Sequence, residues 1–194
     1  MTRDIVLAST SKWRRGLLER LGMPFLQQTP PFEEGPRPDL TPFEVARTFA
    51  CGKAQSLISS CPTALIIGSD QVLELDGRRL NKPESIAGCE QRLRALAGRW
   101  HALHTGVAIV DAKTGVEHVE AVTVRLKMRQ LCDGDIRTYV ERDQPIGAAG
   151  AYLIEGAGIA LFEEIEGSDE SAVVGLPLLL VCRLLRRHGI DPLG

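Results

Sequence analysis

Residues 64–77 read ALIIGSDQVLELDG, and the architecture of the chain is best understood from this segment. Residues 64–68 form a short apolar run with β-branched side chains, which predicts a buried strand. Residues 72–75 continue in extended form, and Asp76-Gly77 is a hairpin turn signal. Asp70 and Gln71 follow the apolar run directly. Ligands of open α/β sheets bind beyond the carboxyl ends of strands. Asp70 is therefore either a turn residue or a group that holds Mg²⁺ or orients water.

Strands and helices alternate outward from this stretch. The capping-box sequence Thr41-Pro42-Phe43-Glu44 predicts a helix that extends to about Ser59. The other predicted helices are 12–21, 85–97, 133–141 and 177–188, and the other predicted strands are 5–8, 100–111, 116–128 and 159–162. Early alternation followed by a long antiparallel pair predicts an α/β fold with a mixed sheet, in two lobes with a cleft.

The composition excludes several classes of protein. With 44% hydrophobic and 25% charged residues, the 194-residue chain matches ordinary globular proteins and is not disordered in bulk. A net charge of −2 disfavours a strongly basic nucleic-acid binder. No stretch resembles a membrane span or a secretory signal. Five cysteines without a C-x-x-C motif argue against a disulfide framework or a zinc site, so we expect a cytoplasmic protein with free thiols.

A candidate anion site follows the first predicted strand, in the sequence STSKWRR, residues 9–15. Hydroxyls beside the backbone N–H groups of a helix start form an anion site, although one serine could simply be the N-cap. Lys12, Arg14 and Arg15 oppose the helix dipole there, and a bound polyanion would resolve that conflict. Trp13 in this polar turn needs a surface to cover.

Further charged residues lie in other loops. Glu33 and Glu34 lie in a proline-rich loop, and Lys53 and Lys82 are isolated cations, each of which is explained singly by solvation. Residues 147–158, called the glycine-rich segment below, allow close approach of the backbone to a ligand. Taken together, an anion site, carboxylates and separated cations suit phosphate-anhydride chemistry, in which cations neutralise phosphates and a carboxylate activates water.

In their order and spacing, these motifs resemble the Maf family of nucleoside triphosphate pyrophosphatases, from Leu7 to about Pro177. The matching stretches are LASTS at 7–11, RR at 14–15, LL at 17–18, KA at 53–54, GSDQ at 68–71, KP at 82–83, TG at 105–106 and VGLP at 174–177. Within the family the chain is most similar to the branch that hydrolyses 7-methyl-GTP. That branch is marked by residues that correspond here to Trp13, Gln71 and Glu155.

The resemblance implies one domain over residues 1–194. Its expected fold is α/β: an elongated mixed sheet of the Maf and inosine triphosphate pyrophosphatase type, flanked by helices, with two lobes and a central cleft. The implied reaction converts 7-methyl-GTP to 7-methyl-GMP and pyrophosphate, which removes a modified nucleotide, and uses a divalent cation, Mg²⁺ or Mn²⁺. The resemblance implies that Asp70 is the proton acceptor and that Lys53, Lys82 and Glu34 are further catalytic residues. It implies that substrate is bound by Ser9, Trp13, Arg14, Gln71 and Glu155. It implies that the metal is bound by Asp70, Glu33 and Glu34.

The sequence departs from the family pattern at two positions. Glu33-Glu34 stands where the family usually has Asp-Glu, and Asn81 replaces the usual glycine before Lys82. The proposed specificity residues remain chemically sensible. The indole face of Trp13 attracts the cationic ring of an N7-methylated guanine, and a carboxylate such as Glu155 accepts two hydrogen bonds from the guanine N1–H and N2–H₂ edge.

Two alternative functions remain open at this point. One is a dTTP/UTP pyrophosphatase of the same family. The other is a non-catalytic regulator of cell division that binds nucleotides or nucleic acid, against which the acidic balance of the chain argues. We expect a nucleoside triphosphate as the partner, with no stable nucleic-acid or membrane partner, and the commonness of dimers among oligomers suggests a homodimer.

Overall fold

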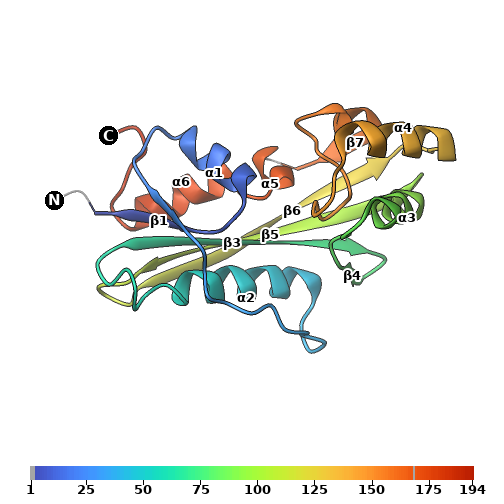
Figure 1. Cartoon of the computed structure of the whole chain (residues 1–194). Helices are drawn as coiled ribbons and strands as arrows, with labels where there is room; N and C mark the ends of the chain where they lie inside the picture. The colour runs from blue at the N-terminus through green and yellow to red at the C-terminus, as the bar shows by residue number, and fades with distance from the viewer. Residues whose placement is uncertain (1–2, 168) are drawn as a thin grey trace.

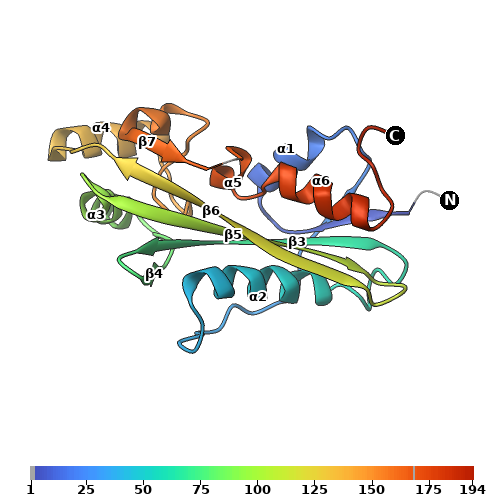
Figure 2. The same ribbon diagram turned by 180° about the vertical axis from the view of Figure 1, so that it is seen from behind.

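A long mixed sheet runs through the computed structural model, which describes residues 3–167 and 169–194 (Figures 1 and 2). Across these residues the seven strands run in the order β2, β1, β3, β5, β6 and β7, with β4 paired to β3. β1 is parallel to β2 and β3, and the remaining pairs are antiparallel. The strands are β1 Ile5–Ala8, β2 Leu26–Gln28, β3 Leu65–Leu75, β4 Arg78–Leu80, β5 Trp100–Asp111, β6 Glu117–Met128 and β7 Phe162–Glu166.

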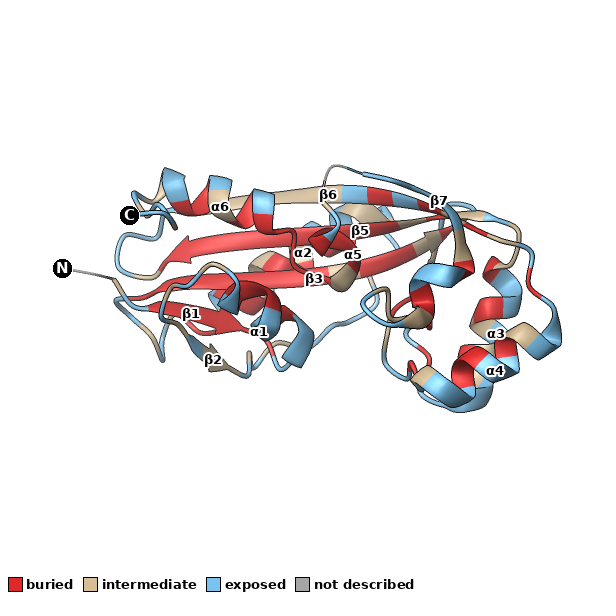
Figure 3. Ribbon diagram, turned by 90° about the horizontal axis from the view of Figure 1, so that it is seen from above, coloured by how far each residue is buried: buried red, intermediate tan, exposed pale blue. Residues whose placement is uncertain are grey.

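Helices cover both faces of this sheet. Helix α2 lies alone on one face in Figures 1 and 2, and the other helices form two groups near opposite ends of the sheet (Figure 3). The first group comprises α1 Lys12–Glu19, α5 Ser171–Val174 and α6 Leu178–Arg187; the second comprises α3 Ile86–Leu96, α4 Asp133–Asp143 and the 3₁₀ helix η1 Ala157–Leu161. The mixed α/β sheet flanked by helices is confirmed. Among the described helices, none is both long and apolar enough to cross a membrane.

The central strands are buried on both faces and contribute to every major core (Figure 3). On β3, Ile67 packs with the core beneath α1 and α6, Ile66 packs with the core beneath α2, and Leu73 belongs to the core of α3 and α4. Alternation of side chains along a strand places neighbours on opposite faces. One continuous strand therefore connects both ends of the molecule.

Helix α2, Pro42–Gln55, begins as the sequence predicts and lies unusually close to the sheet. The Thr41 N–H donates to Glu44 Oε2 at 2.9 Å, which confirms the capping box. A Cβ atom on Gly68 would lie 2.1 Å from the Ala50 carbonyl oxygen, and one on Gly106 would lie 2.2 Å from that of Ala46. These two glycines therefore let the α2 backbone approach β3 and β5 more closely than any side chain would allow.

The edge of β3 is open where the two helical groups meet. β1 pairs with β3 as far as Gly68, and β4 pairs with it from Leu73. No described strand pairs with residues 69–72 on that edge, while their other edge stays bonded to β5. The prediction that Asp70 follows the end of a strand was wrong, because pairing with β5 keeps the chain extended and places Asp70 within β3, opposite Gly106.

The prediction of a strand over residues 159–162 was also wrong. Residues 157–161 form η1, and the strand β7 begins at Phe162 and continues through acidic, mostly exposed residues. A short exposed edge strand lacks the apolar run by which a buried strand is recognised. The hairpin turn expected at Asp76-Gly77 is confirmed, since β4 pairs with β3 directly across it. The short elements β2 and α5 were missed, and α2 ends at Gln55 instead of Ser59.

The close approach of α2 leads to a stability prediction. Gly106→Ala should lower the free energy of unfolding by about 1–3 kcal/mol, as overpacking does, because the new methyl group meets the backbone of Ala46. Gly16→Ala is the control: its Cβ has no neighbour within 4 Å in the middle of α1, so it should stabilise by up to about 1 kcal/mol. Urea denaturation measures both. Equal effects of the two substitutions would contradict the account of α2.

Candidate functional site

A cavity of about 810 Å³ opens at the unpaired edge of β3, between the two groups of helices. Its lining comes from the segment after β1, the proline-rich loop, α2, the chain after β4 and the glycine-rich segment. The sequence-predicted residues that line it are Ser9, Trp13, Arg14, Glu34, Lys53, Gln71, Lys82 and Glu155. Residues far apart in the chain are thus brought together around one space.

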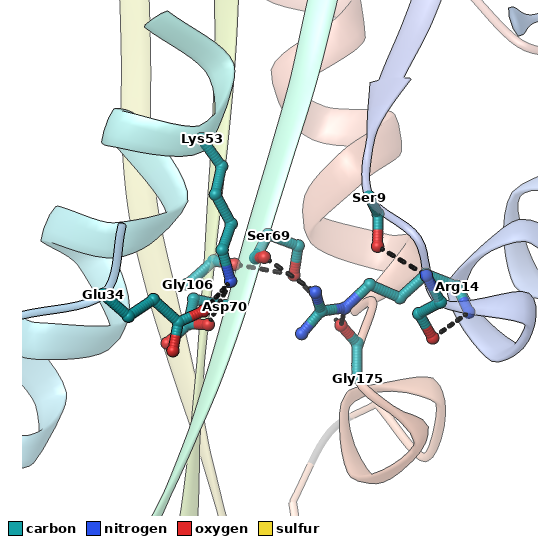
Figure 4. Close-up of polar contacts among 9 residues, drawn as sticks. Ser9, Arg14, Glu34, Lys53, Ser69, Asp70, Gly106 and Gly175 are labelled. Atoms are coloured by element: carbon teal, nitrogen blue, oxygen red, sulfur yellow. Dashed lines mark hydrogen bonds and ion pairs between the residues drawn. The ribbon is translucent and has the colours of Figure 1, made fainter. Parts of the chain in front are cut away.

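Lys53 on α2 joins two of the predicted carboxylates (Figure 4). Its Nζ lies 2.6 Å from Asp70 Oδ1 and 2.6 Å from Glu34 Oε1. Lys53 is 8% exposed and Asp70 is 2% exposed, so Asp70 lies beneath the two residues that line the cavity. Burial of such charges is tolerated only when they are paired. Asp70 and Lys53 reach each other because both occupy the interface that Gly68 and Gly106 make narrow.

The electrostatic environment of Glu34 also reflects this cluster. Partial burial acts to raise the pKa of the carboxyl, but the hydrogen bond and charge of Lys53, with smaller effects of Lys82 and Arg79, outweigh it. The pKa of Glu34 therefore lies below its usual value. The carboxylate form is favoured at neutral pH, and Glu34 lines the cavity.

Arg14 crosses from α1 to β3 on the opposite face of the sheet from Lys53 (Figure 4). Its Nη1 donates to the Ser69 carbonyl at 2.8 Å and its Nε to the Gly175 carbonyl at 2.9 Å. Burial lowers the pKa of the Arg14 guanidinium, and the charges of Asp70 and Glu34 counter this effect. The Arg14 guanidinium is thus hydrogen-bonded to backbone carbonyls, and no carboxylate among the described residues forms a direct ion pair with it.

The hydroxyls before α1 have separate partners. Ser11 is the N-cap of α1, and its Oγ accepts the Arg14 N–H at 3.3 Å. Ser9 Oγ accepts the Ser11 N–H at 3.1 Å and is buried beside the cavity. The capping interpretation is therefore confirmed for Ser11. Among the described residues no acceptor takes the Ser9 hydroxyl proton, and a hydroxyl can both donate and accept.

Gln71 is held in one orientation on β3. Its Nε2 donates to the Ala172 carbonyl at 2.7 Å and the Val173 carbonyl at 3.1 Å, and lies 3.1 Å from Thr105 Oγ1. Because carbonyls can only accept, the amide nitrogen must face α5. Gln71 lines the cavity, and within the described part of the chain no donor reaches its Oε1 atom.

Trp13 and Glu155 lie on the cavity lining at different elements. Trp13 on α1 is 39% exposed, although it is large and apolar. The Lys12 Nζ lies 4.6 Å from the centre of its ring, a cation–π distance. Glu155 ends the cavity-lining part of the glycine-rich segment, and its side chain is exposed. The indole face of Trp13 is therefore partly exposed at the cavity, with the Lys12 ammonium beside it.

Lys82 lines the cavity on the side of α3. The surrounding cleft lowers the pKa of its ammonium, chiefly by partial burial and next by the charge of Arg14, while Asp70 opposes the shift. Asn81 does not adopt a positive φ. The departure from glycine at this position therefore introduces no backbone strain.

Glu33 is the predicted site residue that the fold does not bring to the cavity. It is exposed and lines a separate hollow with Gly35 and Arg37 beside α2. No group of three or more His, Cys, Asp or Glu among residues 3–167 and 169–194 is arranged to hold a metal ion. Glu34 and Asp70 nevertheless converge within 2.6 Å of one ammonium. Mg²⁺ is commonly held by one or two carboxylates together with substrate phosphates, and this pair fits that pattern.

Two polar residues of the lining were not singled out from the sequence. Asp143 at the end of α4 and Tyr152 in the glycine-rich segment both face the cavity. A Cβ on Gly150 would lie 2.0 Å from the Tyr152 ring, so this glycine lets the segment fold onto the aromatic ring. The abundance of glycine predicted that the backbone of this segment approaches another group closely. It could not show that this group is Tyr152 of the same segment.

The chain is similar to known proteins over almost its whole length. The family model described as Maf-like protein matches residues 4–188. A 7-methyl-GTP pyrophosphatase of Chromohalobacter salexigens is 41% identical over 194 residues, covering 100% of both chains. One of Syntrophotalea carbinolica is 39% identical over 191 residues, covering 98% of this chain and 97% of its own.

A solved structure extends the comparison to the fold. A HAM1 protein from Coxiella burnetii superposes with a TM-score of 0.53 at 17% identity, covering 96% of this chain and 100% of that one. At this identity the likeness concerns architecture alone, and it agrees with the elongated mixed sheet. The family match and the two full-length relatives carry the assignment: the chain belongs to the Maf-like protein family.

Proposed function

We propose that this protein is a nucleoside triphosphate pyrophosphatase that converts 7-methyl-GTP to 7-methyl-GMP and pyrophosphate. The observation that carries the proposal is the cavity itself, in which a buried Lys53–Asp70 pair with Glu34 lies near an exposed tryptophan and a carboxylate suited to guanine. The two full-length relatives are named for the same activity. No basic surface is needed, because the substrate is a single nucleotide.

The cations of the cavity suit a triphosphate. Arg14, Lys53 and Lys82 form one electrostatic cluster with the carboxylates Glu34 and Asp70, so three positive charges face two negative ones within this cluster. Lys53 and Lys82 bind phosphate oxygens as charge partners, and Arg14 and Ser9 complete the anion site at the start of α1. These contacts neutralise the negative charge that repels a nucleophile.

Asp70 is the proposed proton acceptor. When the triphosphate attracts the Lys53 ammonium, the Asp70 carboxylate is freed to accept a hydrogen bond from water. The water oxygen forms a bond to the α-phosphorus, and the bond from that phosphorus to the bridging oxygen breaks. One proton of the water passes to Asp70, and pyrophosphate leaves with the bridging oxygen.

A divalent cation fits beside this chemistry. Glu34 and Asp70 are the residues that would hold it, and Glu33 is excluded by its position in the other hollow. When bound, Mg²⁺ or Mn²⁺ would supply additional neutralisation of phosphate charge.

The base half of the cavity gives the proposed specificity. The Trp13 face attracts the delocalised positive charge of 7-methylguanine, and stacking alone contributes about 1–3 kcal/mol per base. Glu155 and the Gln71 Oε1 atom are acceptors, which suits the N–H groups of the guanine edge. Pyrimidines lack that paired donor edge, so a dTTP/UTP preference is the weaker alternative.

Two broader features belong to the same proposal. The chain acts as one domain, since β3 contributes to the cores at both ends and around α2. Its place of action is the cytoplasm, because all five cysteines are free thiols, as suits a reducing compartment.

Removal of the Asp70 charge tests the catalytic assignment. Asp70→Asn should lower kcat for 7-methyl-GTP by at least about 100-fold, as loss of a general base does. Asp76→Asn is the matched control, because Asp76 is exposed at the β3–β4 turn with φ 51°, a conformation that asparagine tolerates. Pyrophosphate release measures both variants. Near-normal turnover of Asp70→Asn would remove Asp70 from the mechanism.

A substrate panel tests the specificity. The wild-type protein with Mg²⁺ or Mn²⁺ should release pyrophosphate from 7-methyl-GTP in preference to GTP, dTTP, UTP and CTP. Trp13→Ala should lower the ratio of kcat/KM for 7-methyl-GTP to that for UTP by at least about 5-fold, the smaller end of a stacking contribution. Trp13→Phe should restore part of that ratio.

Each outcome of the panel has a distinct meaning. Equal losses on both nucleotides in Trp13→Ala would contradict stacking specificity and leave the catalytic centre intact. A preference for dTTP or UTP would replace the base assignment by the alternative within the family. No pyrophosphate from any nucleotide with either metal would overturn the enzyme proposal in favour of a binding protein.

A further inference from the structure

Arg92 on α3 connects the two loops that close the cavity at the end of α3 and α4. Its Nη2 donates to the Asn81 carbonyl at 2.6 Å, directly before Lys82. Its Nη1 donates to the Ala149 carbonyl at 3.0 Å, in the glycine-rich segment. A direct backbone bond adds to this connection, because Gly147 N–H donates to the Pro83 carbonyl at 3.0 Å. One guanidinium thus spans two loops that are distant in the sequence.

The charge of Arg92 is not used in an ion pair with any described carboxylate. Its hydrogen bonds go to carbonyl oxygens, and partial burial lowers the pKa of its guanidinium. Arg94, two residues further along the same helix, instead pairs with Glu90 and Asp133 at the surface. Partial burial of the Arg92 guanidinium costs free energy, because only hydrogen bonds to carbonyl oxygens compensate for its desolvation. Its position therefore calls for a structural explanation.

The position of the two loops supplies that explanation. The loop at 81–83 carries Lys82, which faces the phosphate side of the cavity, and the glycine-rich segment carries Glu155 and Tyr152. Neither loop belongs to a helix or strand at these residues. Catalytic groups on loops lose precision unless a neighbouring residue fixes them, and the planar fork of arginine can hold two acceptors at once, which a lysine ammonium cannot do with the same geometry.

We propose that Arg92 is a positioning residue, which holds the Lys82 loop against the glycine-rich segment so that Lys82 meets the triphosphate at a fixed place. It touches no substrate and acts through Lys82. The inference rests on the proposed function, because it concerns how that cavity holds a nucleoside triphosphate. It adds a residue that the family motifs quoted above do not include.

A double-mutant cycle tests the connection between Arg92 and Lys82. Arg92→Met should lower kcat/KM by about 10-fold, in line with the cost of a small misplacement of a catalytic group. In the Lys82→Met background the same substitution should cost about 2-fold or less, because the group that it positions is already absent. Arg94→Met is the control on the same helix and should change kcat/KM by less than about 2-fold. Equal costs of Arg92→Met in both backgrounds would overturn the proposal.

A chemical rescue separates positioning from general stability. Methylguanidinium, at concentrations well below those that denature proteins, should restore part of the activity of Arg92→Ala and none of that of Arg92→Ala/Lys82→Met. A melting temperature measured for each variant shows whether the protein stays folded at the assay temperature. Absence of rescue in a folded Arg92→Ala protein would contradict the proposal.

The same assays distinguish a failure of the proposed activity from a failure of the positioning role of Arg92. All variants are compared on whichever nucleotide the wild-type protein hydrolyses best. If the wild-type protein hydrolyses none, the proposed function fails. If it is active and Arg92→Met behaves like Arg94→Met, only the positioning role fails.

Discussion

The close contact between α2 and the centre of the sheet is the constraint on which the site depends. Gly68 and Gly106 leave room for the α2 backbone, since a Cβ on either would lie 2.1–2.2 Å from a carbonyl oxygen of the helix. Asp70 faces the same side of the sheet as these glycines and lies opposite Gly106. Lys53 on α2 can therefore reach Asp70 without leaving the interface. The glycines that appear as family motifs in the sequence are thus required for the geometry of the ion pair.

The buried ion pair between Lys53 and Asp70 makes the stability of the protein depend on both partners. A buried charge that loses its partner destabilises a protein by about 3–5 kcal/mol, so neither Lys53 nor Asp70 is independent of the other. Glu34 approaches the same ammonium from the proline-rich loop. The open edge of β3 explains how residues from both faces of the sheet serve one cavity: Asp70 and Lys53 approach from the α2 side, and Arg14 and Gln71 contact groups on the α1 and α5 side. A fully paired strand would keep these two sets apart.

Much of the fold follows from local sequence patterns. The long strands β3, β5 and β6 have strong apolar patterns, and Thr41 with Glu44 defines the start of α2 by its capping chemistry. The patterns could not show that β3 continues through Ser69 and Asp70, because that continuity comes from pairing with β5. They also missed β7, whose exposed acidic residues have no apolar run.

The site residues were recognised chiefly from motifs, and the structure explains which ones assemble. Eight of the predicted residues line the cavity, and Asp70 lies beneath Lys53 and Glu34. Glu33 points into another hollow, since successive residues of an extended loop face different sides. The connection of Arg92 to two loop carbonyls could not be predicted from the sequence. Every residue has a backbone carbonyl, so residue type does not indicate which carbonyl accepts a hydrogen bond.

The position of bond cleavage shows whether water attacks the α-phosphorus beside Asp70. Hydrolysis of 7-methyl-GTP in ¹⁸O-labelled water, under single-turnover conditions, should place the label in 7-methyl-GMP and leave pyrophosphate unlabelled, because water attacks the α-phosphorus beside Asp70. Mass spectrometry of both products gives the answer. Label in pyrophosphate, or release of labelled orthophosphate, would contradict the account of how this cavity holds and cleaves its substrate.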